Sequence, residues 1–179
     1  MKRFLLSLAM FSCAGIVNAQ PPLANSRTRI YIVRHGEKEL GNDPALTAAG
    51  KVRAGDLMRI LKRKDIRHIY VSQYRRTQMT GDSMRIQLGI DTIRYKADTT
   101  GVDLLNKIIA NGDQRRAILV IGHSNTIPQI IRKLGVMNYP QENIADNEFD
   151  NLFLVRYKKH KARVTKYKYG AATGTSAGM

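Results

Sequence analysis

The sequence predicts a single α/β domain with a mostly parallel sheet and helices on both faces. Short runs of β-branched and aromatic residues alternate with longer segments of helical periodicity. The run 117–121, AILVI, is the most apolar of the domain, as expected for a central strand that is buried on both faces. Two last strand-like runs, 152–157 and 162–169, flank the basic turn KKHK and predict a hairpin at the end of the sheet.

The remaining elements follow in chain order. A first strand is predicted at 29–33. A helix start is predicted at Asn42-Asp43-Pro44, because Asn or Asp can cap a helix and Pro suits its first turn. From Leu46 to Leu61, apolar and small residues at spacings of three and four indicate one buried helix face. We further expect strands at 66–71 and 92–95, and helices at 76–88, 102–110 and 126–134.

Residues 1–19 have the layout of a secretory signal peptide, with Lys2 and Arg3, an apolar run and the small-residue site Val17-Asn18-Ala19. The apolar run is shorter than the roughly 20 residues that a spanning helix needs, so no transmembrane segment is predicted. The protein is therefore expected to be exported, either to the periplasm or as a secreted protein. Lipid attachment at Cys13 is the alternative, although the residues before it match such a site poorly.

One domain is predicted over 20–169, because a chain of this length supports a single core. The small and polar segment 170–179 is expected to be a disordered tail. The 30 Lys and Arg residues against 14 Asp and Glu give a formal charge of +16, which favours anionic partners. Nucleic acid is the less favoured anion, because the basic clusters lack interleaved aromatic residues apart from KYKYG near the C-terminus.

Three predicted parallel strands end in polar residues. The first runs into Arg34-His35-Gly36, the second through Gln73-Tyr74 into Arg75-Arg76, and the strand 117–121 into Gly122 and His123-Ser124-Asn125. In parallel α/β sheets ligands bind beyond the carboxyl ends of the strands, so these side chains are expected to converge. Two histidines and at least two arginines at one rim make an anion pocket that contains a nucleophile. A neutral imidazole can attack phosphorus while guanidinium groups hold the other phosphate oxygens.

The three motifs together name a family. Arg34-His35-Gly36-Glu37 resembles the RHG signature of the histidine phosphatase, or phosphoglycerate mutase-like, superfamily. VSQYRRTQMT resembles its second motif, with Gln73 where many relatives have proline, and VIGHSNTIP resembles its third. The resemblance implies a phosphoglycerate mutase-like fold and, for a short chain without a large cap insertion, the compact phosphohistidine-phosphatase-like branch.

The resemblance also implies the site residues. His35 would be the nucleophile that forms a phosphohistidine, and Arg34, Arg76 and His123 would hold the phosphoryl group. The backbone of Gly36 and the hydroxyl of Ser124 are further candidate phosphate ligands, with helix capping an equal reading for Ser124.

The sequence leaves open which residue is the general acid that protonates the leaving group. Asp98, just after the third strand, is the first candidate, with Glu37 and Asp103 behind it. For each of the three, a turn, a cap or a surface carboxylate is an equal reading. The acidic segment 141–151 is interpreted as structural rather than as the pocket rim.

The predicted activity is hydrolysis of a phosphomonoester or a phosphoprotein, without metal or other cofactor. A metal site at His35 and His123 is not favoured, because no third ligand is evident at a suitable spacing. The alternatives are an anion-binding module on the same fold without turnover and, less favoured, a mutase-type phosphotransferase. The natural substrate and the oligomeric state do not follow from the sequence.

Overall fold

The computed structural model describes residues 23, 27–158 and 160–174. The elements of this part of the chain are β1 (Arg29–Arg34), α1 (Ala48–Leu61), β2 (Ile66–Ser72), α2 (Arg75–Leu88), β3 (Thr92–Tyr95), α3 (Val102–Ala110), β4 (Ala117–Gly122), α4 (Ile127–Lys133), β5 (Asn151–Lys158) and β6 (Lys161–Lys168). None of the helices described here is both long enough and apolar enough to cross a membrane. The predicted signal peptide at 1–19, including Cys13, lies outside the described residues.

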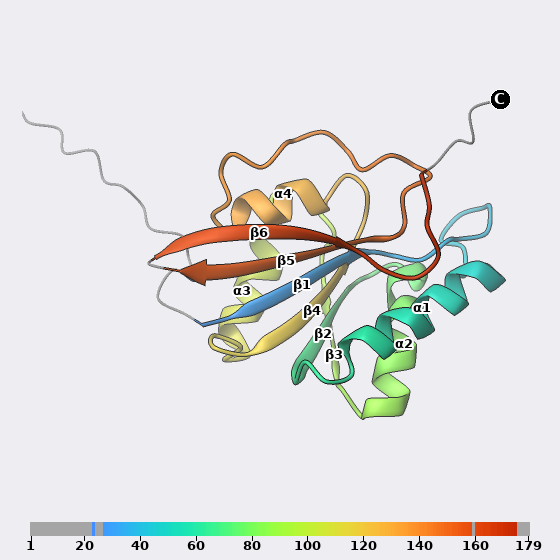
Figure 1. Cartoon of the computed structure of the whole chain (residues 1–179), viewed down its shortest axis with the longest axis horizontal. Coiled ribbons are helices and arrows are strands. Elements are labelled where there is room, and N and C mark those ends of the chain that lie inside the picture. Colours follow the sequence, from blue (N-terminus) through green and yellow to red (C-terminus); the bar gives the residue numbers. More distant parts are fainter. Residues whose placement is uncertain (1–22, 24–26, 159, 175–179) are drawn as a thin grey trace, which may run out of the picture.

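The described strands form one sheet in the order β3-β2-β4-β1-β5-β6 (Figure 1). β1 pairs in parallel with β4, and β2 pairs in parallel with both β4 and β3. β5 runs antiparallel to β1, and β6 runs antiparallel to β5. The prediction of an α/β fold with a mostly parallel sheet that ends in a hairpin is therefore confirmed.

Successive side chains of each strand point to opposite faces of the sheet, and this alternation produces two cores, one on each face. Ile30 and Ile32 of β1 pack in the core beneath α3 and α4, whereas Tyr31 and Val33 pack in the core beneath α1 and α2. Figure 1 shows α4 and the α1–α2 pair on opposite sides of the strands. Every residue of β4 is buried, as its AILVI run predicts for a strand covered on both faces.

The predicted start of the first helix is wrong by several residues, since α1 begins at Ala48 rather than near Pro44. Thr47 is the cap, because its hydroxyl accepts a hydrogen bond from the Gly50 N–H at 3.1 Å. Asp43, which could have capped an earlier helix, has a positive φ of 49° and accepts from the Arg75 N–H at the start of α2. The segment between β1 and α1 is thus a loop that reaches across to α2.

The other element boundaries agree with the sequence predictions to within one or two residues. α2 begins at Arg75, and α4 begins at Ile127, with Thr126 as its cap residue. Such differences are usual, because helix ends and strand ends depend on single hydrogen bonds.

The segment from residue 170, for which the composition predicts disorder, is described as far as Gly174. In it, Thr173 donates a hydrogen bond through its hydroxyl to Asp150 and accepts one from the Phe149 N–H. The carbonyl of Ala171 accepts from Arg53 on α1. These contacts hold 170–174 against the start of β5; residues 175–179 lie outside the described part of the chain.

Candidate active site

The carboxyl ends of β1 and β4 are aligned, so the polar residues that follow them meet. Arg34 pairs with Gly122 in the sheet register, and the His35 N–H donates to the Gly122 carbonyl at 3.1 Å. A cavity of about 280 Å³ opens at this rim. It is lined by Arg34, His35, Lys38, Tyr74, Arg76, Ala97, His123, Ser124, Asn125, Thr126 and Asp146.

His35 lies buried with one ring nitrogen already engaged. Its Nδ1 is 2.8 Å from the carbonyl oxygen of Gly36, and because a carbonyl only accepts, Nδ1 carries the proton. The unprotonated nitrogen is then Nε2, the atom that a nucleophilic imidazole needs. Burial lowers the pKa of His35 to about 3, and the nearby charges of Arg34 and Arg76 act in the same direction. The ring is therefore neutral at physiological pH.

The loop that carries His35 is fixed by contacts to α1 and α2. The Gly36 N–H donates to the Thr80 hydroxyl at 3.0 Å, and that hydroxyl donates to the Arg76 carbonyl. A Cβ atom on Gly36 would lie 2.9 Å from the Gly50 carbonyl oxygen, and one on Gly50 would lie 2.1 Å from the Glu37 carbonyl oxygen. Both glycines are needed for this close backbone approach. Gly36 thus packs and positions the loop, and its N–H is not directed to the cavity as a phosphate ligand.

Arg34 is held in place by the segment that precedes β5. Its Nη1 donates to the carbonyls of Ala145, Asp146 and Glu148 at 2.8, 3.1 and 3.2 Å. The guanidinium also lies over the ring of Phe149, 4.2 Å from its centroid. The buried Nε has no hydrogen-bond partner among the described residues. Arg34 is thus rigid but keeps a donor for a ligand.

Arg76 has the same character on the other side of the cavity. Its Nη1 is 3.6 Å from a carboxylate oxygen of Asp43, and its guanidinium lies over the ring of Tyr74 at 4.4 Å. Like that of Arg34, its buried Nε finds no partner within the described part of the chain. Two unpartnered guanidinium donors on residues that line one cavity are an observation that favours an anion there, because a buried donor without an acceptor costs free energy.

His123 completes the cluster. Its ring lies 5.3 Å from that of His35, centroid to centroid. Nδ1 is 3.3 Å from Arg76 Nη2, a donor, so Nδ1 accepts there and Nε2 donates to the Ser72 hydroxyl at 2.9 Å. Burial lowers the pKa of His123 to about 4, with further lowering by Arg76 and Arg34. A phosphate dianion beside the ring would oppose these effects and favour the protonated form.

The three carboxylates proposed from the sequence as the acid are all engaged elsewhere. Glu37 binds Arg53 through both oxygens at 2.7 to 3.0 Å. Asp98 accepts from the backbone of Thr100 and Gly101 before α3, and these hydrogen bonds, with the Thr100 hydroxyl as the largest contributor, hold the pKa of Asp98 below its ordinary value. Asp103 accepts from the Lys96 N–H at 2.7 Å. None of the three lines the cavity.

The carboxylate that does line the cavity is Asp146, in the segment that the sequence reading interpreted as structural. The segment serves both purposes, because its carbonyls hold Arg34 while Asp146 lies at the rim, 3.7 Å from Arg34 Nη2. Lys38 and Tyr74 also line the cavity, although the sequence motifs assign a role to neither of them. Asp146 follows Arg34 by more than 100 positions, so no spacing pattern in the chain connects the two.

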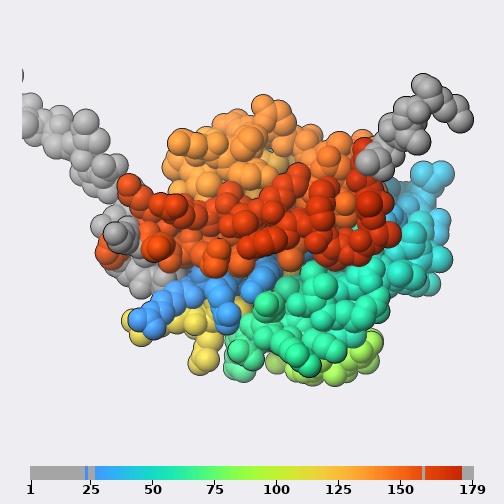
Figure 2. Space-filling view, viewed as in Figure 1, coloured from blue at the N-terminus to red at the C-terminus, as the bar shows by residue number. Residues whose placement is uncertain are grey.

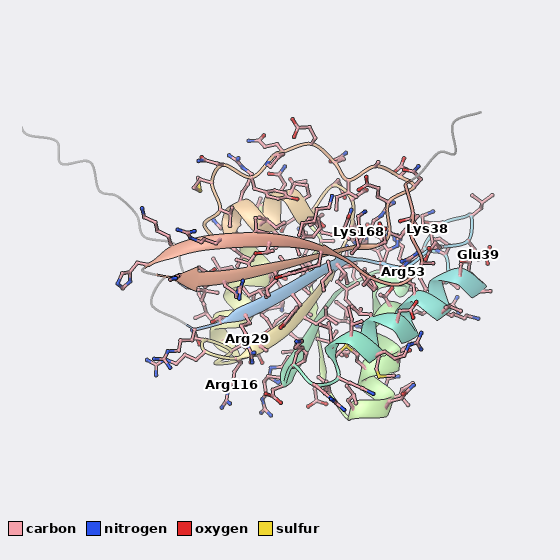
Figure 3. All side chains as sticks on the ribbon, in the orientation of Figure 1. Arg29, Lys38, Glu39, Arg53, Arg116 and Lys168 are labelled. Carbon is pink, nitrogen blue, oxygen red and sulfur yellow. The ribbon has the colours of Figure 1, made fainter. Side chains whose placement is uncertain are left out.

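Within residues 23, 27–158 and 160–174, no group of three His, Cys, Asp or Glu side chains is arranged to hold a metal ion. The positive charge of the site comes from Arg34, Arg76 and Lys38, against Asp43 and Asp146. Figure 3 labels Lys38 at one end of the strands, with Arg29 and Arg116 at the other. The candidate active site therefore occupies only one end of the sheet.

Comparison with known proteins agrees with this geometry. Residues 30–99 match the model of the histidine phosphatase superfamily (branch 1). No protein with a curated description matches the sequence.

Similar folds occur among solved structures. A protein from Agrobacterium tumefaciens assigned as the phosphohistidine phosphatase SixA is 19% identical, covers 82% of this chain and 99% of its own, and has a TM-score of 0.57. A mycobacterial glucosyl-3-phosphoglycerate phosphatase is 14% identical over 80% and 99% of the two chains, with a TM-score of 0.59. A phosphoserine phosphatase from Entamoeba histolytica is 16% identical over 77% and 95%, with a TM-score of 0.55. At these identities the likeness shows the fold.

The match of residues 30–99 and the shared fold together confirm that this chain resembles the histidine phosphatase superfamily, with compact phosphohistidine-phosphatase-like structures among those that share its fold.

Proposed function

We propose that this protein is a phosphatase that hydrolyses phosphate monoesters, or a phosphoprotein, through a phosphohistidine at Nε2 of His35. The observation that carries the proposal is the neutral, buried His35 with its Nδ1 proton held by the Gly36 carbonyl, in a cavity lined by two arginines with unpartnered Nε donors. This set supplies a nucleophile and an anion clamp together.

In the first step Nε2 of His35 attacks phosphorus while the bond from phosphorus to the leaving oxygen breaks. Arg34, Arg76 and His123 stabilise the charge on the transferring group, with Ser124 at the cavity wall as a further donor. In the second step a water attacks the phosphohistidine, the bond from phosphorus to nitrogen breaks, and inorganic phosphate leaves. His35 returns to its neutral form. Neither step requires a metal ion, because the guanidinium groups supply the positive charge.

We assign proton donation to the leaving oxygen to Asp146 rather than to Asp98, Glu37 or Asp103. Asp146 lies at the cavity and the other three carboxylates are committed to hydrogen bonds or an ion pair away from it. In the second step the Asp146 carboxylate then accepts a proton from the attacking water.

The cavity size favours a small leaving group or one that extends into solvent. Its volume of about 280 Å³ is just below the range of typical ligand cavities, about 300–1,000 Å³. The solved structures of similar fold include phosphatases of phosphoserine and of glucosyl-3-phosphoglycerate, which supports a phosphate ester as the substrate class. Export remains part of the proposal through the signal-peptide pattern of 1–19, since the enzyme would then act on phosphate esters outside the cytoplasm.

The test is hydrolysis of a panel of phosphate esters by the wild type and by His35→Ala, with the wild type denatured in alkaline detergent during turnover to trap a phosphohistidine, whose phosphorus–nitrogen bond survives base but not acid. We expect turnover and an acid-labile phosphoenzyme in the wild type and neither in the variant. Phosphate binding without turnover in the wild type would instead establish the anion-binding module. Hydrolysis that persists in His35→Ala would reject His35 as nucleophile.

A further inference from the structure

A second cationic site lies at the opposite end of the sheet from the cavity. Arg29 is the first residue of β1, and in the antiparallel register it lies directly opposite Arg156 of β5. Arg156 in turn lies opposite Arg163 of β6. All three residues are exposed. With strands about 4.8 Å apart, the outer two Cα atoms of this arginine row are roughly 10 Å apart.

The arginine row faces the α1 side of the sheet. Along β1 and β5, Tyr31 and Leu154 pack in the core of that side, and Arg29 and Arg156 are each two residues away from one of them. Burial raises the pKa of Tyr31, while the charges of Arg29 and Arg156 lower it, in agreement with the place of both arginines on the same face as Tyr31. The row is therefore one continuous patch on one face of three neighbouring strands.

The patch is energetically costly as it stands. Like charges directly opposite one another on neighbouring strands repel and destabilise a sheet. In the described part of the chain, none of the three arginines is in an ion pair. Arg29 makes one long hydrogen bond, of 3.4 Å, to the carbonyl of Lys64. An anionic partner would convert this repulsion into attraction.

An apolar groove begins beside the arginine row. It has a volume of about 350 Å³ and runs between the C-terminal end of α1 and the β5–β6 hairpin. It is lined by Tyr31, Ile60, Leu61, Lys64, Leu152, Leu154, Tyr167 and Lys168. Figure 2 shows this region of the surface, with β1 visible between α1 and the hairpin. Tyr31 and Lys64 both line the groove. Arg29 donates to the Lys64 carbonyl and lies two residues from Tyr31 on β1, so the arginine row and the groove are contiguous.

We propose that this face binds an acidic phospholipid surface, with lipid phosphates on the arginine row and apolar lipid in the groove. Guanidinium groups bind phosphate through paired donors, and the aliphatic groove walls match a lipid better than a nucleic-acid backbone. A second copy of the chain fits poorly, because a two-fold contact would place arginines against arginines. From Arg29 to His35 the extended strand spans roughly 20 Å, so the lipid site is separate from the catalytic cavity.

The experiment measures partition of the full chain onto phosphatidylcholine vesicles with and without roughly one-third phosphatidylglycerol. Arg156→Gln/Arg163→Gln is compared with Arg59→Gln/Arg85→Gln, which removes the same charge from exposed arginines on α1 and α2. We expect the first pair to lower the partition coefficient on acidic vesicles about 30-fold, or about fivefold for each arginine, and the second pair to leave it nearly unchanged. Any contribution of residues 1–19 to vesicle binding is the same in the two double variants.

The groove is tested separately with Tyr167→Ser against Ile86→Ser, which changes an exposed apolar residue on α2. We expect weaker vesicle binding only for Tyr167→Ser, and ester hydrolysis at the wild-type rate in every variant. Equal losses for the two arginine pairs, or for the two serine variants, would overturn the lipid site. Loss of duplex DNA binding in Arg156→Gln/Arg163→Gln with vesicle binding retained would overturn it in favour of nucleic acid.

Discussion

Arg53 of α1 and Glu37, two residues beyond the candidate nucleophile, form an ion pair with Nη2 2.7 Å from Oε1. The Arg53 side chain is 3% exposed and also donates to the carbonyls of Tyr169 and Ala171. One guanidinium therefore joins the loop that carries His35, the first long helix and the segment after β6. This explains why Glu37 follows the RHG motif without reaching the cavity.

We predict that Arg53→Gln lowers the free energy of unfolding by about 2–4 kcal/mol, because it leaves the Glu37 carboxylate and two carbonyls without their donor. Urea unfolding measures the change. Arg59→Gln, on the same helix but exposed, should change it by no more than about 0.5 kcal/mol. Adding Glu37→Gln to Arg53→Gln should recover part of the loss; a double variant as unstable as the sum of the singles would disprove the coupling.

Thr80→Val tests whether the Gly36 N–H positions His35. The substitution keeps the shape of the side chain but removes the acceptor of a buried N–H, at a cost of about 1–3 kcal/mol. We expect kcat to fall roughly 10- to 100-fold with a smaller change in KM, since the loop shifts while the arginines remain. Thr92→Val on the edge strand β3 is the control, and equal kcat values for the two variants would refute the positioning role.

The proton donor is tested through the leaving group. Asp146→Asn should lower kcat for an alkyl phosphate roughly 100-fold or more, and should have little effect on an activated aryl phosphate, whose leaving group needs no proton. Asp98→Asn should change kcat for the alkyl and the aryl phosphate by the same factor, because Asp98 accepts backbone hydrogen bonds before α3. A loss confined to alkyl phosphates in Asp98→Asn would reverse the assignment.

The buried histidines predict acid-sensitive stability. Their folded pKa values, about 3 for His35 and about 4 for His123, lie below the ordinary value of 6.5, so between these limits the unfolded chain binds more protons. Stability is therefore fully retained above pH 6.5 and is lost as the pH falls towards 4, by an amount on the order of a few kcal/mol. Urea unfolding at pH 7, 5.5 and 4.5 should show a smaller loss for His35→Gln than for the wild type. Parallel curves would mean that His35 is not buried in its neutral form.

The sequence predicted the strands, the helices and the residues that cluster at the cavity with few errors. Hydrophobic patterns of period two and near four report which side chains must be buried, and burial decides element type. The rule that ligands bind beyond the carboxyl ends of parallel strands then predicts that Arg34, His35 and His123 lie together, and all three line the cavity. The predicted start of α1 was wrong because Asp43 and Thr47 are both residue types that can cap a helix. The contact of Asp43 with the Arg75 N–H of α2 leaves Thr47 as the cap.

By itself, the sequence determined the α/β fold, the cluster of arginines and histidines at the strand ends and the charge of the protein, because these depend on local periodicity and on residue type. Only the tertiary structure decided which carboxylate faces the cavity, what Glu37 and Gly36 contact, and that three arginines form one row beside an apolar groove. Such relationships join residues up to more than 100 positions apart, and their geometry depends on how layers pack and strands align rather than on any pattern within a short stretch of chain.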